Sequence, residues 1–80
     1  MKYFTTIYKL YTEDVIGEKE VKLMEMYCDD TFLDACDEAE TEIEWAKENM
    51  KGSAFEKYIR GYRYEIVGLD GSTYVKEIEC

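Results

Sequence analysis

Apolar residues are concentrated in two stretches near the start of the chain, residues 2–12 (KYFTTIYKLYT) and 19–28 (KEVKLMEMYC). Both stretches are rich in aromatic, β-branched and thioether side chains, a composition typical of β-strands. The connection between them, EDVIGE, contains Gly17, which suits a turn. The pattern therefore predicts a first β-hairpin.

The hydrophobic period lengthens to that of a helix after Thr31. Thr31 and Asp34 have the spacing of a helix N-cap pair, and Gly52 follows Lys51 as a stop signal. The sequence therefore predicts a helix from about residue 31 to residue 51. Its apolar positions are Phe32, Cys36, Ala39, Ile43, Ala46 and Met50.

Two further strands are expected at residues 55–67 (FEKYIRGYRYEIV) and 72–79 (STYVKEIE), joined by a two-residue turn at Asp70-Gly71. If Leu69 pairs with Ser72, the register places Glu65 opposite Lys76 and Ile66 opposite Val75, which are favourable cross-strand pairs. The chain is thus predicted to be one α+β domain over residues 1–80. Its element order is ββαββ, with a four-stranded, mainly antiparallel sheet and one helix packed on one face.

This order of hairpin, helix and hairpin resembles the β-grasp arrangement of the immunoglobulin-binding domain of protein G. The resemblance lies in the order and length of the elements and involves no sequence motif. It implies a sheet in which the two terminal strands pair in parallel. A fully antiparallel four-stranded sheet fits the same order of elements equally well.

Charge is distributed very unevenly along the 80 residues, which carry a formal net charge of −9. Nine acids and a single base, Lys47, lie between Asp29 and Glu48. Several of these acids, such as Glu38 and Glu42, are like-charged neighbours one helical turn apart, an arrangement that costs about 0.2–0.5 kcal/mol for each pair in an isolated helix. Helix stability alone does not favour this pattern, so the pattern indicates a role in binding.

Trp45 is the only tryptophan of the chain, and it lies within this acidic helix. On a 3.6-residue period it points about 160–200° away from Ile43 and the apolar stripe. An exposed indole among carboxylates is typical of a binding hot spot. The side chains predicted to contact a partner are Asp34, Asp37, Glu38, Glu42, Trp45 and Glu48. In the alternative interpretation, Trp45 folds over the helix edge and the acids only keep the surface solvated.

A second candidate surface arises because the strands are apolar on both faces, while one helix can cover only one face. In the third predicted strand, Tyr58, Tyr62 and Tyr64 alternate with Ile59 and Arg63. A tyrosine-rich open face suits a homodimer or a second partner, because tyrosine buries a large area and keeps a polar tip. Alternatively, these tyrosines serve only as strand formers.

Several function classes are disfavoured by the composition. The chain has no histidine, no phosphate-binding glycine loop and no nucleophile motif, so no catalytic residue, cofactor or metal site is expected. Cys28, Cys36 and Cys80 lack the spacing of a zinc site or a disulfide framework. Direct nucleic-acid binding is disfavoured by the net negative charge. No stretch approaches the ~18 apolar residues of a membrane helix or the apolar run of a signal peptide, so a cytoplasmic protein of a bacterial or phage-infected cell is expected.

Two hypotheses remain after these exclusions. In the first, the acidic helix docks on a basic protein partner, a nucleic-acid-binding effector, as an inhibitor that mimics nucleic acid. In size, acidity and lack of catalytic motifs the chain resembles the small phage-encoded anti-CRISPR proteins, several of which block nucleic-acid sites; the resemblance is one of class and rests on no motif. In the second, the chain is a homo-oligomeric structural or assembly module of a phage or mobile element.

Overall fold

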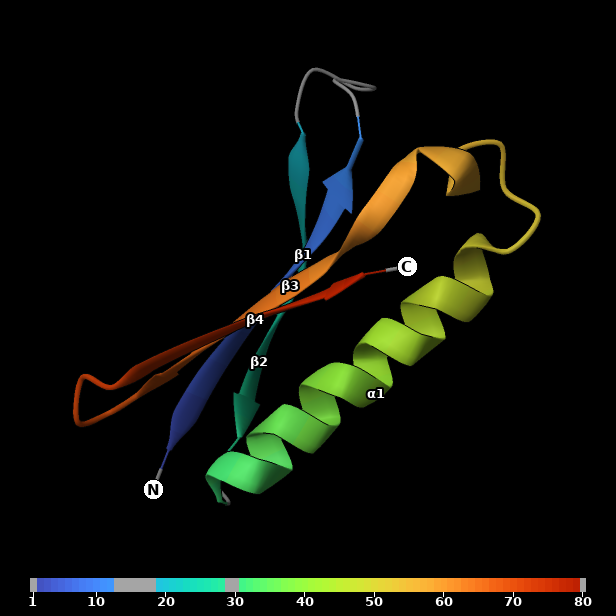
Figure 1. The fold of residues 1–80 in the computed structure, drawn as a ribbon. Coiled ribbons are helices and arrows are strands. Elements are labelled where there is room, and N and C mark those ends of the chain that lie inside the picture. Colours follow the sequence, from blue (N-terminus) through green and yellow to red (C-terminus); the bar gives the residue numbers. More distant parts are fainter. Residues whose placement is uncertain (1, 13–18, 29–30, 80) are drawn as a thin grey trace.

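The computed structural model describes residues 2–12, 19–28 and 31–79, which form one sheet and one long helix (Figure 1). The elements, in chain order, are β1 (Tyr3–Tyr11), β2 (Glu20–Cys28), α1 (Phe32–Met50), a short 3-10 helix η1 (Glu56–Tyr58), β3 (Ile59–Gly68) and β4 (Thr73–Glu79). This confirms the predicted α+β class and the ββαββ order. The largest difference in a boundary is at the third strand, which was predicted to begin at residue 55: residues 56–58 form η1, and β3 begins at Ile59.

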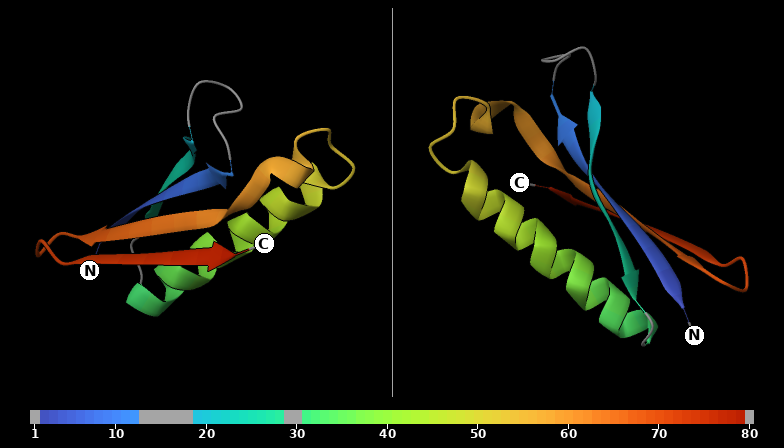
Figure 2. Two further views of the ribbon diagram at one scale, coloured as in Figure 1. Left: turned by 45° about the horizontal axis from the view of Figure 1, so that its top comes forward. Right: turned by 180° about the vertical axis from the view of Figure 1, so that it is seen from behind.

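The strand order in the sheet is β2-β1-β3-β4, and every neighbouring pair is antiparallel. This order rules out the β-grasp arrangement, in which the terminal strands would pair in parallel. After β2, α1 passes over β1 and returns the chain to the other side of that strand. β3 therefore pairs with β1, at the position that β4 would occupy in a β-grasp sheet. Seen from behind, α1 lies across one face of the sheet, and no described segment covers the opposite face (Figure 2).

The ends of α1 follow the predicted signals. The Oγ1 atom of Thr31 accepts a hydrogen bond from the backbone N–H of Asp34 at 3.2 Å, and Asp34 Oδ2 accepts one from the backbone N–H of Thr31 at 3.4 Å. Together these bonds form a capping box that satisfies two donors otherwise left without partners at a helix start. After the helix, Gly52 has a φ of 79°, a conformation that favours glycine.

The core lies between α1 and the inner faces of β1 and β3. Ala35, Ala39 and Ile43 of α1 are fully buried. The two alanines allow the helix backbone to approach the sheet. Ile43 fills the space between helix and sheet, and its burial contributes about 1.5–3 kcal/mol to the stability of the fold. The sheet residues of this core are Tyr3, Ile7, Tyr11, Ile59, Tyr62, Tyr64 and Ile66.

The second hairpin differs from the predicted one by a single residue. The backbone N–H of Gly68 donates to the carbonyl oxygen of Ser72 at 2.9 Å, so the loop contains three residues, with Gly71 at a φ of 88°. Glu65 is therefore opposite Val75, and Ile66 is opposite Tyr74, so both predicted pairs are wrong. A slip of one residue exchanges the faces of a strand. Lys76 consequently pairs with Tyr64 and lies on the helix side of the sheet.

Gly61 provides a test of how closely β4 is held on β3. A Cβ atom at this position would lie 2.5 Å from the backbone oxygen of Ile78, closer than real Cβ contacts. Gly61→Ala should therefore lower the free energy of unfolding by about 1–3 kcal/mol, because either β4 or the alanine must move. Urea denaturation followed by circular dichroism measures this change.

Glu79→Ala is the matched control, because Glu79 is the exposed register partner of Gly61. Its effect should stay within about 0.5 kcal/mol, as for most surface substitutions. Equal stability of Gly61→Ala and the unsubstituted chain would mean that β4 is not packed as closely as described.

Candidate functional site

The acids of α1 differ in what they contact, and Glu40 is the one joined to the sheet. The buried Tyr64 hydroxyl donates a hydrogen bond of 2.7 Å to Glu40 Oε2, and Lys76 Nζ lies 3.5 Å from the same oxygen. The hydrogen bond from Tyr64 lowers the pKa of the Glu40 carboxyl, with Lys76 adding to the effect. Burial is the main cause that raises the pKa of Tyr64 well above its usual range, and the hydrogen bond to Glu40 adds to this effect. Glu40 thus belongs to the packing of the helix on the sheet.

Three other acids of α1 are used within the helix itself. Asp34 completes the N-terminal capping box. Glu44 pairs with Lys47 at 3.7 Å and Glu48 with Lys51 at 3.0 Å, each across three residues. Both glutamates are exposed, and such exposed pairs contribute little to stability.

The remaining acids of α1 have no counter-ion within the described part of the chain. Asp37, Glu38 and Glu42 take part in none of the ion pairs found there. Asp37 and Glu38 are exposed, as are Asp34 and Glu48, whereas Glu42 is half-buried beside β2. We refer to Asp34, Asp37, Glu38, Glu42, Trp45 and Glu48 together as the acidic face. These six predicted partner-binding residues all lie on α1 and extend from its first turn, at Asp34, to its last turn, at Glu48.

Trp45 lies toward the carboxyl end of the acidic face and is 66% exposed, which confirms the predicted exposure of its indole. It borders a groove of about 250 Å³ between α1 and β2, whose walls include Leu23, Met24 and Glu42. The register of β2 against β1 shifts at this point, since Ile7 pairs with Met24 while Tyr8 pairs with Lys22. This β-bulge lets the adjacent residues Leu23 and Met24 both pack toward the helix side, where they line the groove.

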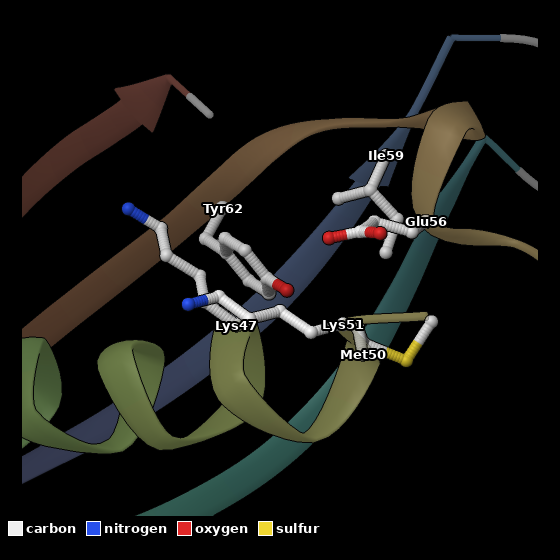
Figure 3. Close-up of a pocket in the computed structure, with 6 residues that line it drawn as sticks. All are labelled: Lys47, Met50, Lys51, Glu56, Ile59 and Tyr62. Atoms are coloured by element: carbon white, nitrogen blue, oxygen red, sulfur yellow. The ribbon is translucent and has the colours of Figure 1, made fainter. Parts of the chain in front are cut away.

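A second recess lies at the carboxyl end of α1, next to the start of β3 (Figure 3). Its volume is about 220 Å³, and Lys47, Met50, Lys51, Glu56, Ile59 and Tyr62 line it. The hydrogen bond to Glu48 raises the pKa of the Lys51 ammonium, so this base stays charged and is paired with Glu48. The recess therefore offers mainly apolar side-chain stems, and it suits a small apolar group better than an anion.

The tyrosines predicted for the open face of the sheet are placed elsewhere. Tyr62 and Tyr64 are 1% and 0% exposed and lie beneath α1, and Tyr58 is half-buried in η1. The prediction that they form an exposed surface is therefore wrong. Both faces of β3 looked apolar in sequence, and the helix covers the face that carries the tyrosines.

The face that α1 leaves uncovered, which we call the open face, carries a different set of side chains. The register aligns them in four rows across the strands in the order β2-β1-β3-β4. The rows are Tyr27–Phe4–Val67–Thr73, Glu25–Thr6–Glu65–Val75, Lys22–Tyr8–Arg63–Glu77 and Glu20–Leu10–Gly61–Glu79. The first row is apolar except for Thr73, and each of the other rows contains two or three charged residues.

Arg63 organises the charged part of the open face. Its guanidinium lies 4.5 Å from the centre of the Tyr8 ring and donates to both carboxylate oxygens of Glu20, at 2.6 and 3.0 Å. It also donates to Glu65 at 2.9 Å. Since β1 separates β3 from β2, this side chain joins three strands. Sequence reasoning did not find this role, because it depends on strand order.

Neither a metal site nor a membrane helix is found in the described ranges 2–12, 19–28 and 31–79. No group of three or more acidic, cysteine or histidine side chains there could hold a metal ion. No helix among those residues is long and apolar enough to cross a membrane. Comparisons of this chain with protein-family models, curated proteins and solved structures found no match.

The Tyr64–Glu40 hydrogen bond provides a pH-dependent test of how α1 is held. Tyr64→Phe should lower the free energy of unfolding by about 1 kcal/mol at neutral pH, because it removes one hydrogen bond to a carboxylate that water partly reaches. The folded-state pKa of Glu40 is lowered. This contribution is therefore present above the unfolded-state pKa of about 4.3 and is lost as the pH falls through the folded-state value.

Urea denaturation of both proteins near neutral pH and near pH 3 measures this difference, which should shrink in acid. Tyr74→Phe is the matched control, because its ring packs against Phe32 and Tyr64 while none of the described hydrogen bonds uses its hydroxyl. A difference that stays constant with pH would show that Glu40 does not carry the effect.

Proposed function

We propose that this chain is a small acidic protein-binding module that acts as an inhibitor or decoy. In this proposal the acidic face docks on a basic groove of a nucleic-acid-handling protein and occupies the place of nucleic acid. The observation that carries the proposal is the 66% exposed Trp45 on the same face as Asp37, Glu38 and Glu42, which lack counter-ions in the described part of the chain.

Glu40 differs from these acids in its contribution to the fold. Glu40 is joined to the sheet and helps to hold the helix, so its presence follows from folding. Glu38 and Glu42 lie one turn apart on the same helix, where like charges cost about 0.2–0.5 kcal/mol per pair. Their cost is offset if a basic partner supplies the missing counter-charges.

Trp45 would make binding at the acidic face more specific than charge alone. A docked partner would desolvate a large aromatic surface here, and tryptophan is among the residues that most often dominate binding free energy. The adjoining groove is lined by Leu23 and Met24. Methionine is unbranched and adapts to irregular partner surfaces, so this side of Trp45 can receive an apolar side chain of the partner.

The carboxylates recur along α1 at about one-turn spacing, ~5.4 Å, and so form a line of negative charge. A basic groove that binds a phosphate backbone is complementary to such a line. Steering by this charge should make association fast and sensitive to salt. Inhibitors of this kind act in the phage-type anti-defence role of the class that the chain resembles, and the protein would then work in the cytoplasm of an infected cell.

The test is capture of partners from a bacterial lysate at low and at moderate salt. The unsubstituted chain should retain a basic nucleic-acid-handling protein, and capture should fall as salt rises. Trp45→Ala, or the combined Glu38, Glu42 and Glu48→Lys variant, should weaken capture at least tenfold, because the first removes the aromatic anchor and the second reverses the charge. Because Trp45 is the only tryptophan, its fluorescence should also shift on binding.

The matched control reverses three acids away from the acidic face, as Glu56, Glu77 and Glu79→Lys. This variant changes the net charge by the same amount but leaves α1 intact, so it should capture the partner as the unsubstituted chain does. Equal loss in both triple variants would reduce the effect to net charge alone. Equal capture by all the proteins would refute a role for the acidic face.

A further inference from the structure

We infer that the open face is the contact surface of a weak homodimer, formed with a second copy of this chain. This inference does not depend on the proposed function, because it concerns the opposite side of the molecule. Its centre is the first row of the open face, where Phe4, Tyr27 and Val67 are 50%, 50% and 41% exposed. Val75, in the next row, is 52% exposed.

These side chains form a continuous apolar area. Phe4 is paired with Tyr27 on one side and with Val67 on the other. The rings of Phe4 and Tyr27 meet edge to face with their centres 4.9 Å apart. Aromatic and aliphatic side chains that are held on a sheet in this way present a preorganised surface, so their burial by a partner requires little further ordering.

The charge distribution favours this face over the acidic face for contact with a second copy. A chain with a net charge of −9 repels its own copies, and the acidic face cannot approach its equivalent. The open face is close to neutral, and its ions are largely paired within the sheet. These pairs are Lys22–Glu25, Arg60–Glu77, Arg63–Glu20 and Arg63–Glu65. Two copies can therefore meet here without bringing unmatched acids together.

The face is also complementary to itself about a two-fold axis. If this axis runs along the first row, through Phe4, then each Phe4 meets its equivalent and the strands of the two sheets run antiparallel. Lys2, which lies over the Tyr27 ring at 5.8 Å, would then face the row of the second copy that contains Glu25 and Glu65. Opposite charges thus flank the apolar centre on both sides, as the isologous contact of a two-fold dimer requires.

The small area of this contact limits the affinity of the dimer. The contact spans four strands at a spacing of ~4.8 Å. It includes the first row, the position of Lys2 on one side of it and the row of Glu25 on the other, which are each two residues apart. These dimensions give roughly 19 × 20 Å, or about 400 Å² in projection. A standard interface buries about 800 Å² on each partner. We therefore expect a weak and reversible dimer, with a dissociation constant on the order of 100 μM.

Sedimentation velocity from about 20 μM to about 500 μM tests this inference, since the range brackets the expected dissociation constant. The unsubstituted chain should change from mainly monomer to mainly dimer. Phe4→Thr combined with Val67→Thr should weaken dimerisation at least tenfold, because threonine keeps the strand preference and removes the apolar contact. Leu33→Gln is the matched control, because Leu33 is 71% exposed but lies on α1, and it should leave the dimer unchanged.

Lys2→Glu is a second variant that leaves the packed side chains in place. It should weaken dimerisation several-fold, because a carboxylate would then face Glu25 and Glu65 of the other copy. A monomer throughout the concentration range would overturn the inference and leave the open face to a partner of another sequence. A dimer that survives both Phe4→Thr/Val67→Thr and Lys2→Glu would also overturn it, because the contact would then lie on another surface.

Discussion

The burial of the alanine and isoleucine stripe of α1 against β1 and β3 is the constraint on which the rest of the structure depends. One helix can cover only one face of a four-stranded sheet, so every strand residue is assigned either to the core or to the open face. Ile43 packs into the inner face, and Trp45, two residues later, must therefore point to solvent. The same packing event thus creates the core, exposes the acidic face and leaves the open face bare.

The hydrogen bond between Tyr64 and Glu40 adds direction to this packing. Apolar contacts are not directional, and small side chains such as Ala35 and Ala39 would let a helix turn about its axis. A buried hydroxyl that donates to one carboxylate of α1 favours a single rotation of the helix, since other rotations would leave the phenol without its acceptor. Lys76 reinforces this arrangement only because the β3–β4 register places it on the helix side of the sheet.

The features that could be predicted from the sequence depend on residues that are close together in the chain. The helix limits follow from the Thr31 and Asp34 capping pair and from a long periodic pattern, and the exposure of Trp45 follows from helical geometry. The hairpin register could not be predicted, because the two-residue and three-residue loops at Gly71 differ by one position. The burial of Tyr64 could not be predicted either, since both faces of its strand are apolar and alternation alone does not show which one the helix covers.

The acidic face and the open face lie on opposite sides of the molecule, and this separation has a physical consequence. A dimer joined through Phe4 and Val67 would hold two copies of Trp45 on its two outer surfaces, far from the dimer contact. Binding at one surface would then leave the other free for a second site of the same partner or assembly. Engagement of both would raise the apparent affinity without any new contact, provided that the spacing of the two sites matches the dimer. A weak dimer would be sufficient for this, because a partner that holds both copies also raises their local concentration.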